Sequence, residues 1–229
     1  MTLAAPASAP TPLRYPLVVL AGAAATLLTL VGLAPHWVVR QVDGPVQRAI
    51  LTTRTPALDR AFLAITHGGD VAVLLPVAIV VVALVASRTR QALPACAAAA
   101  GLAAGQVLVD LLKVTIRRPR PPATSAIQHV AGWSMPSGHA TMATIVWGAA
   151  ILELLQRVRS PRARTSLVVA GAVAITAVGA SRLYLGVHWL TDVVAGWCLG
   201  AVLVVGVVSA VSVLTDPSRA DAPSRPLAG

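Results

Sequence analysis

Two histidines in this chain stand in patterns that suit the transfer of a phosphoryl group. His188 is followed four residues later by Asp192, a spacing that puts both side chains on one face of a helix. A carboxylate bonded to one imidazole nitrogen fixes the tautomer and leaves the lone pair of the other nitrogen free as a nucleophile or base. A structural His–Asp pair at a helix end has the same spacing, so this pattern alone leaves both interpretations open.

The second histidine ends a short motif, Pro136-Ser137-Gly138-His139, that directly precedes a long apolar run. Ser137 is suited to be the N-cap of a helix, and the free N–H groups and dipole of such a helix start bind phosphate. Gly138 lets the backbone approach a ligand closely, and His139 could protonate a leaving-group oxygen as a general acid. An ordinary loop-to-helix cap is the alternative for this stretch.

Three cations could complete such a site. Lys113 is the only lysine of the chain, Arg120 follows seven residues later, and Arg182 comes after another apolar run. Fixed positive charges stabilise the oxygens of a phosphoryl group during transfer. Basic residues that flank a membrane span are more often simple interfacial anchors, and this stays our interpretation of Arg117 and Arg118.

The composition is that of a membrane protein. Of the 229 residues 56% are hydrophobic and only 11% are charged. Basic residues outnumber acidic ones, 18 to 8, but apolar runs separate the arginines and aromatic residues make up 3%, which argues against nucleic-acid binding. Cys96 and Cys198 lie in apolar runs without metal-ligand spacing. No acidic cluster suits magnesium, and we expect neither a metal nor a cofactor.

The apolar runs predict an all-α fold, an integral membrane bundle of six transmembrane helices with short interfacial helices. A helix of about 20 residues crosses the hydrocarbon core. The six runs extend over about 17–34, 71–86, 93–112, 140–155, 167–180 and 190–214. Residues 35–70 mix arginines with apolar residues, as interfacial amphipathic helices do. We expect one domain over residues 13–215 and disordered tails at 1–12 and 216–229.

Alternation of the spans brings the motifs to one membrane face. The end of the third span, the start of the fourth, the end of the fifth and the start of the sixth all fall on the same side. Nine basic residues lie on each face, and without Lys113, Arg120 and Arg182 the motif face keeps six. The positive-inside rule therefore favours a motif face that points away from the cytoplasm.

The three motifs together resemble the signature of the type 2 phosphatidic acid phosphatase superfamily, whose fold is shared with vanadium haloperoxidases. The matching stretches are Lys113-x6-Arg120-Pro121, Pro136-Ser137-Gly138-His139 and Ser181-Arg182-x5-His188-x3-Asp192. The resemblance implies that His188 attacks phosphorus, Asp192 orients it and His139 acts as general acid. It also implies that the phosphate is held by the remaining signature residues Lys113, Arg120, Ser137, Gly138 and Arg182.

The resemblance implies a multi-pass plasma-membrane lipid phosphatase with a phosphohistidine intermediate and a phosphorylated lipid as substrate. An isoprenyl diphosphate is the leading substrate class, followed by phosphatidic acid and phosphatidylglycerol phosphate. Transfer of the phosphoryl group to another lipid, hydrolysis of soluble phosphates, and a non-catalytic anion binder or transporter are the alternatives. The sequence does not indicate an oligomeric state.

Polar residues outside the signature are assigned mostly to structural roles. Asp110 lies one turn before Lys113, and we expect it to pair with Lys113 or Arg117. Glu153 is expected to pair with Arg157. Residues 67–70 are interpreted as a helix boundary. His129 and Trp133 could border the substrate entrance, and interfacial anchoring explains Trp133 as well.

Overall fold

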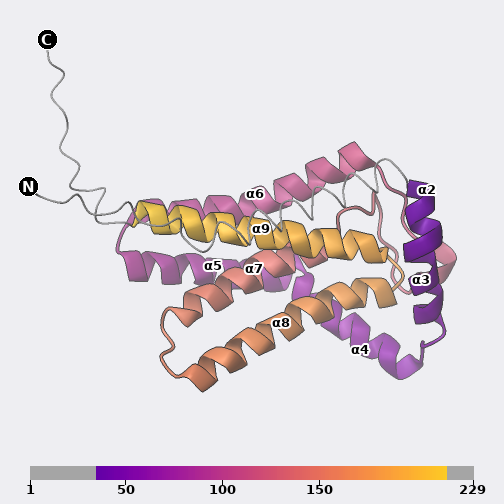
Figure 1. Ribbon diagram of the computed structural model, residues 1–229, viewed down its shortest axis with the longest axis horizontal. Helices are drawn as coiled ribbons and strands as arrows, with labels where there is room; N and C mark the ends of the chain where they lie inside the picture. Colours follow the sequence, from indigo (N-terminus) through magenta and orange to yellow (C-terminus); the bar gives the residue numbers. More distant parts are fainter. Residues whose placement is uncertain (1–34, 216–229) are drawn as a thin grey trace, which may run out of the picture.

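Residues 35–215, the part of the chain that this computed structural model describes, form helices and connecting turns without a β-strand (Figure 1). In chain order the elements are α2 (Pro35–Val38), the π-helical η1 (Val39–Asp43), α3 (Gly44–Leu51), α4 (Pro56–Thr66), the 3₁₀ turn η2 (His67–Gly69), α5 (Val71–Thr89), α6 (Ala92–Ile116), the 3₁₀ turn η3 (Ala123–Ser125), α7 (Gly138–Leu155), α8 (Pro161–Tyr184) and α9 (Leu190–Leu214).

Five helical stretches in this part of the chain are long and apolar enough to cross a membrane. They are Pro56–Thr89, which contains α4, η2 and α5, and then Ala92–Ile116, Gly138–Leu155, Pro161–Tyr184 and Leu190–Leu214. The second to sixth predicted spans fall in α5 to α9, so these predictions are confirmed as helices. The predicted first span, 17–34, and the predicted tails lie outside the described residues. The count of six spans and the domain limits stay predictions.

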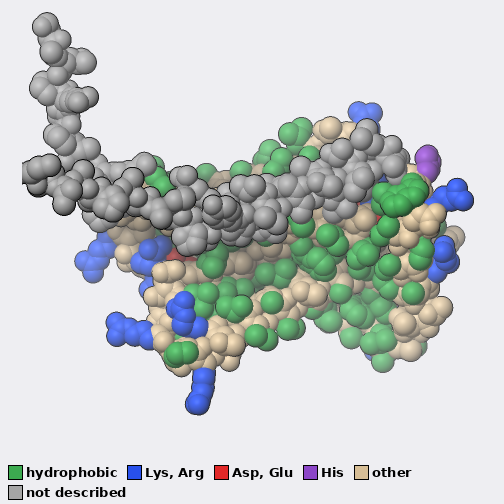
Figure 2. Space-filling view, viewed as in Figure 1, with side chains coloured by type: hydrophobic (Ala, Val, Ile, Leu, Met, Phe, Trp, Pro, Cys, Tyr) green, Lys and Arg blue, Asp and Glu red, His purple; other side chains and the backbone are tan. Residues whose placement is uncertain are grey.

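Apolar side chains cover the middle of the bundle, as lipid contact requires. Leu75 and Ile79 on α5, Val107 on α6 and Val173 on α8 are exposed. Figure 2 shows hydrophobic side chains across the middle of the visible face, with Lys and Arg towards its two ends. This distribution agrees with helices that cross a bilayer and end at its two polar surfaces.

Small residues let α7 and α9 pack closely. A Cβ added to Gly196 would lie 2.9 Å from the carbonyl oxygen of Ser137, and one added to Gly200 would lie 2.6 Å from Cβ of Thr144. Glycines at such a seam let two membrane helices approach backbone to backbone. The seam joins the helix that begins after Ser137 to the helix that carries Asp192.

The segment from α2 to α3 lies across one end of the bundle (Figure 1). At this end α6 and α8 finish and α7 and α9 begin, as the alternation of spans predicts. Asp43, the last residue of η1, is 1% exposed although it is charged. The interfacial placement of these short helices stays a prediction.

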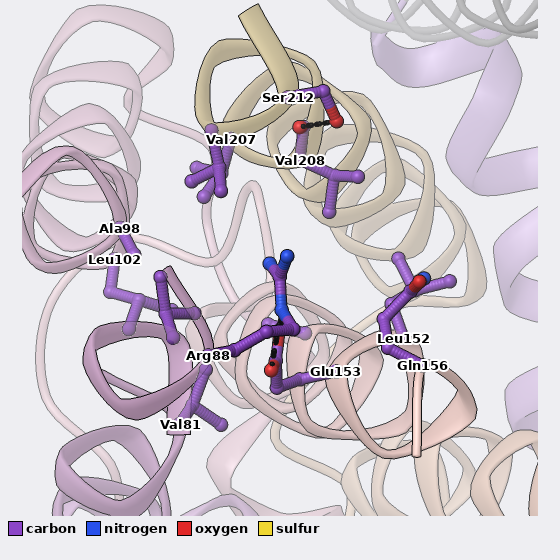
Figure 3. A pocket seen from close by; sticks show the side chains of 13 residues that line it. Val81, Arg88, Ala98, Leu102, Leu152, Glu153, Gln156, Val207, Val208 and Ser212 are labelled. Atoms are coloured by element: carbon purple, nitrogen blue, oxygen red, sulfur yellow. Dashed lines mark hydrogen bonds and ion pairs between the residues drawn. The ribbon is translucent and has the colours of Figure 1, made fainter. Parts of the chain in front are cut away.

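A cavity of about 150 Å³ lies near the opposite end, where α5 and α7 finish. Side chains of α5, α6, α7 and α9 line it, and most of them are apolar (Figure 3). Its charged residues are Arg88 and the buried Glu153, whose Oε1 accepts a 2.9 Å hydrogen bond from Arg88 Nε. Arg157 Nη2 lies 3.4 Å from the same oxygen, so the predicted pair with Glu153 is present and Arg88 is the closer partner. None of the signature residues lines this cavity.

Candidate active site

The turn between α8 and α9 presents His188 against the start of α9. His188 is 2% exposed, and its Nδ1 lies 3.3 Å from Oδ2 of Asp192. The same carboxylate oxygen accepts the backbone N–H of Trp189 at 2.9 Å, which anchors the first turn of α9. Asp192 therefore favours the tautomer with a proton on Nδ1 and leaves Nε2 of His188 with its lone pair.

The charge of His188 follows from its surroundings. Burial lowers its pKa from the ordinary 6.5 to about 4, and the charges of Arg120 and Arg182 act in the same direction, whereas Asp192 opposes them. The imidazole is therefore neutral at pH 7. A neutral, oriented imidazole is the form that can attack phosphorus.

Asp192 is held by a network that includes Arg118. Nη1 of Arg118 donates to Oδ1 of Asp192 at 2.5 Å and to Oγ1 of Thr191 at 2.7 Å. Nη2 of Arg118 donates to Asp43, which also accepts the backbone N–H of Thr191 at 2.9 Å. Arg118 is 3% exposed.

Our interpretation of Arg118 as an interfacial anchor is therefore wrong. The pattern of basic residues could not separate it from its neighbour Arg117, which is exposed and donates Nε to the carbonyl of Val114. Only the packed structure shows that Arg118 points inward, between two carboxylates.

Arg120 connects the loop after α6 to the turn between α8 and α9, which carries His188. Its Nη1 donates to the carbonyl of Val187 at 2.7 Å and lies 3.1 Å from Nε2 of His188. Its Nε donates to the carbonyl of Gly132 at 2.9 Å. Burial lowers the pKa of Arg120 and Asp192 opposes this, but a guanidinium stays charged at pH 7. A cation thus stands next to the nitrogen that would attack.

The other two predicted cations reach the same end of the bundle. A Cβ added to Gly138 would lie 3.7 Å from Nζ of Lys113, so the ammonium group adjoins the start of α7. Arg182 is 1% exposed, and its Nη1 donates to Oγ1 of Thr66 at 2.5 Å and to Oε1 of Gln128 at 3.2 Å. Its buried Nε has no hydrogen-bond partner within residues 35–215.

Ser137 is the N-cap of α7, as the sequence predicts. Its Oγ accepts the backbone N–H of Ala140 at 3.5 Å, and its own N–H donates to the carbonyl of Asp192 at 3.0 Å. The cap residue is fully buried. The first turn of α7, with the N–H groups of Gly138 and His139, therefore starts beside the first turn of α9.

His139 has a carboxylate partner that the sequence analysis missed. Its Nε2 lies 2.9 Å from Oδ1 of Asp70, at the start of α5. Residues 67–70 do form the predicted helix boundary, but that description left out the contact. The alternation of spans indicates this contact. Because α5 starts on the membrane face where α6 ends, Asp70 must lie on the same face as the three motifs.

The remaining polar residues lie at the margin of this site. Asp110 is exposed and accepts from Nε2 of Gln106 at 2.9 Å; within residues 35–215 it forms no ion pair with Lys113 or Arg117. The predicted pairing of Asp110 is therefore wrong. His129 and Trp133 are exposed in the loop between α6 and α7, and their place at a substrate entrance stays a prediction.

The fold and the site together describe a helical membrane protein whose two histidines and three cations meet at one end of the bundle. The family model described as the PAP2 superfamily matches residues 94–216. Phosphatidylglycerophosphatase B of Bacillus subtilis is 31% identical over 167 residues, which covers 72% of this chain and 81% of that protein. The chain belongs to the PAP2 superfamily, which confirms the resemblance in its three motifs.

Further comparisons agree with this assignment. An undecaprenyl-diphosphatase of Sulfolobus acidocaldarius is 42% identical over 69 residues, 30% of this chain and 29% of that protein. The crystal structure of a transmembrane PAP2 type phosphatidylglycerolphosphate phosphatase from Bacillus subtilis superposes with a TM-score of 0.77 at 26% identity, covering 88% of this chain and 98% of the other. The crystal structure of Aquifex aeolicus LpxE shares the fold, with a TM-score of 0.55 at 22% identity over 73% of this chain and 95% of the other.

Proposed function

We propose that this protein is a membrane lipid phosphatase that hydrolyses a phosphate monoester or diphosphate of a lipid through a phosphohistidine intermediate. The observation that carries the proposal is the environment of His188. One ring nitrogen faces Asp192, and the other lies 3.1 Å from the guanidinium of Arg120. A nucleophile and a charge that can stabilise the phosphoryl oxygens thus stand side by side.

In the first half-reaction, Nε2 of His188 attacks phosphorus and the bond from phosphorus to the leaving oxygen breaks. The electron pair of that bond goes to the oxygen, which takes a proton from His139. Lys113, Arg120 and Arg182 neutralise the phosphoryl oxygens, and the N–H groups at the start of α7 add hydrogen bonds.

In the second half-reaction, water attacks the phosphohistidine and gives a proton to His139. The bond between nitrogen and phosphorus breaks, inorganic phosphate leaves, and His188 returns to its neutral form. Fixed cations do the neutralising in both halves, so the proposed reaction needs no metal ion.

The substrate is a phosphorylated lipid whose tail lies among the apolar helices while its phosphate meets the polar bundle end. The names of the relatives support this class, since they include a phosphatidylglycerophosphatase and an undecaprenyl-diphosphatase. An isoprenyl diphosphate, phosphatidic acid and phosphatidylglycerol phosphate are therefore the three substrates to compare first.

The site faces away from the cytoplasm of a plasma membrane in this proposal. The burial of Arg118 supports this orientation, because a buried arginine does not count as an interfacial anchor. When Arg118 is left out together with Lys113, Arg120 and Arg182, five basic residues remain on the site face, against nine on the other face.

Phosphate release by the purified protein tests the function. We expect release from one or more of the three lipid phosphates in the presence of a chelator, and lower rates on short-chain soluble esters. His188→Ala should fold normally and lose activity by at least about 10⁴-fold, because the attacking atom is missing. A strict requirement for magnesium, or undiminished release by His188→Ala, would overturn the mechanism.

The same assay separates the alternatives. Appearance of a newly phosphorylated lipid in place of free phosphate would indicate a phosphotransferase. Preference for soluble esters would indicate a phosphatase of soluble substrates. Lipid binding without turnover by the wild-type protein would indicate an anion binder, a role for which the His188–Asp192 pair has no evident use.

A further inference from the structure

The turn between α4 and α5 places a second carboxylate at the site. Oδ1 of Asp70 lies 2.9 Å from Nε2 of His139, and Oδ2 of Asp70 lies 2.6 Å from Nδ1 of His67. The carboxylate thus bridges two histidines, one oxygen to each. His67 is on the outer side, with 69% of its side chain exposed, against 28% for His139.

The position of this turn is fixed from three sides. Thr66, just before it, accepts a hydrogen bond from Arg182 at 2.5 Å. Nε1 of Trp147 on α7 donates to the carbonyl of Gly68 at 3.0 Å. Gly69 lies against the imidazole of His139, because an added Cβ would be 2.8 Å from Cδ2 of that ring. Asp70 is therefore held next to His139 by the packing of the turn as well as by their own contact.

The two histidines of the site use opposite ring nitrogens for their carboxylates. His188 faces Asp192 with Nδ1, whereas His139 faces Asp70 with Nε2. A carboxylate accepts a proton from the nitrogen that it faces and so decides which nitrogen remains for chemistry. This leaves Nε2 of His188 for attack and Nδ1 of His139 for proton transfer.

We propose that Asp70 is the positioning residue of the general acid His139. This inference rests on the proposed function. Asp70 holds the proton on Nε2 throughout, so that the proton given to the leaving oxygen, and later taken from water, is the one on Nδ1.

The dependence on the leaving group tests this role. An alkoxide needs a proton as it departs, whereas a nitrophenolate is stable without one. Two probes with similar tails differ strongly in this respect: a long-chain alkyl phosphate, and a nitrophenyl phosphate that carries an alkyl tail. Asp70→Asn should lower kcat/KM, which reports the steps up to departure of the leaving group, by at least about tenfold on the alkyl phosphate and by less than about threefold on the nitrophenyl phosphate. His139→Ala should show the same contrast with a larger loss.

Asp59→Asn is the matched control. Asp59 is a carboxylate on α4. It accepts a 2.7 Å hydrogen bond from the hydroxyl of Tyr184 and not from a histidine. An asparagine can still accept that bond, so activity on both probes should equal that of the wild type. Asp70→Ser is a second variant, since it removes the carboxylate and keeps a residue that is favoured at the start of a helix; it should also lose activity selectively on the alkyl phosphate.

The outcomes are distinguishable. Equal losses on both probes would mean that Asp70 serves only the structure, and no loss would mean that His139 does not need it; either result overturns the inference alone. Inactivity of the wild-type protein on both probes would overturn the proposed function and the inference together. If Asp70→Asn does not fold, Asp70→Ser, measured on both probes, decides in the same way.

Discussion

The imidazole of His188 is almost fully enclosed by protein, and this enclosure decides its charge. Because burial lowers its pKa to about 4, the ring stays neutral well below the pH at which an exposed histidine takes up a proton. Protonation would occupy the lone pair on Nε2 and stop the attack on phosphorus. Activity should therefore fall as the pH falls through about 4, and not at 6.5.

Measurement of kcat/KM between pH 3.5 and 9 checks this prediction. Phosphate groups of the substrate titrate near pH 6 and add a limb of their own. The second pKa of each substrate should be titrated separately, so that the part of the pH profile due to the substrate is known. A further loss of activity centred near pH 6.5, beyond that of the substrate, would contradict the neutral, buried His188.

Arg118 gives a second prediction at the scale of single residues. Arg118→Met leaves Asp43 and Asp192 buried without their shared cation, and breaking a buried pair in this way costs about 3–5 kcal/mol. We expect a clear fall in the thermal unfolding midpoint and a loss of kcat, because Asp192 also loses a partner that orients it. Arg117→Met, at the exposed neighbouring position, should change neither. If the two variants had the same stability and the same kcat, Arg118 would not be needed to hold Asp43 and Asp192 in place.

At the scale of helices, the seam between α7 and α9 positions the site. Gly200→Ala would place a methyl group 2.6 Å from Cβ of Thr144 and 2.8 Å from the carbonyl of Thr141. Overpacking of this kind typically costs about 1–3 kcal/mol, and here it also pushes apart the helices that begin at Ser137 and carry Asp192. We expect lower thermal stability together with lower kcat.

Gly206→Ala on the same helix is the control. An added Cβ at this position meets no atom of residues 35–215 within 4 Å, and alanine is the better helix former by about 1 kcal/mol. Stability should stay the same or rise, with normal activity. If Gly206→Ala lowered thermal stability and kcat as much as Gly200→Ala, the effect could not be assigned to the seam between α7 and α9.

At the scale of the whole molecule, the proposed orientation makes a prediction about labelling. In a background with Cys96→Ala and Cys198→Ala, Thr124→Cys places a thiol in η3 on the site face, and Arg159→Cys places one in the loop between α7 and α8. Both positions are exposed. A membrane-impermeant thiol reagent applied to intact cells should label only the cysteine at position 124. Both should react after permeabilisation, and the reverse pattern in intact cells would invert the topology.

The arrangement of the long helices was predictable because each apolar run is both a span and a helix. Alternation of the spans then brings His139 and His188 to one end without any knowledge of packing. Arg118 was not predictable in this way, since a basic residue after a span looks the same whether it turns outward to the membrane surface or inward to Asp192. Asp43 and Thr191 have no local pattern that marks them, because their partners lie far away in the sequence.

Asp70 is a different case. Its neighbours His67, Gly68 and Gly69 have the features of a break between helices, and that description was correct but incomplete. A residue that interrupts a helix at a membrane surface can also project into the site at that surface. The alternation of spans places the start of α5 on the same membrane face as the three motifs, which is where Asp70 meets His139.

The seating of the segment from α2 to α3 has a practical consequence for anyone who extracts the protein from its membrane. This segment contacts Asp192 indirectly, through the buried Asp43 and its bonds to Arg118 and Thr191. A detergent that displaces this segment from the bundle would loosen the network that holds Asp192 while the long helices stayed intact. We expect such a preparation to keep most of its circular dichroism signal and to lose its turnover, so solubilisation conditions should be chosen by activity as well as by helix content.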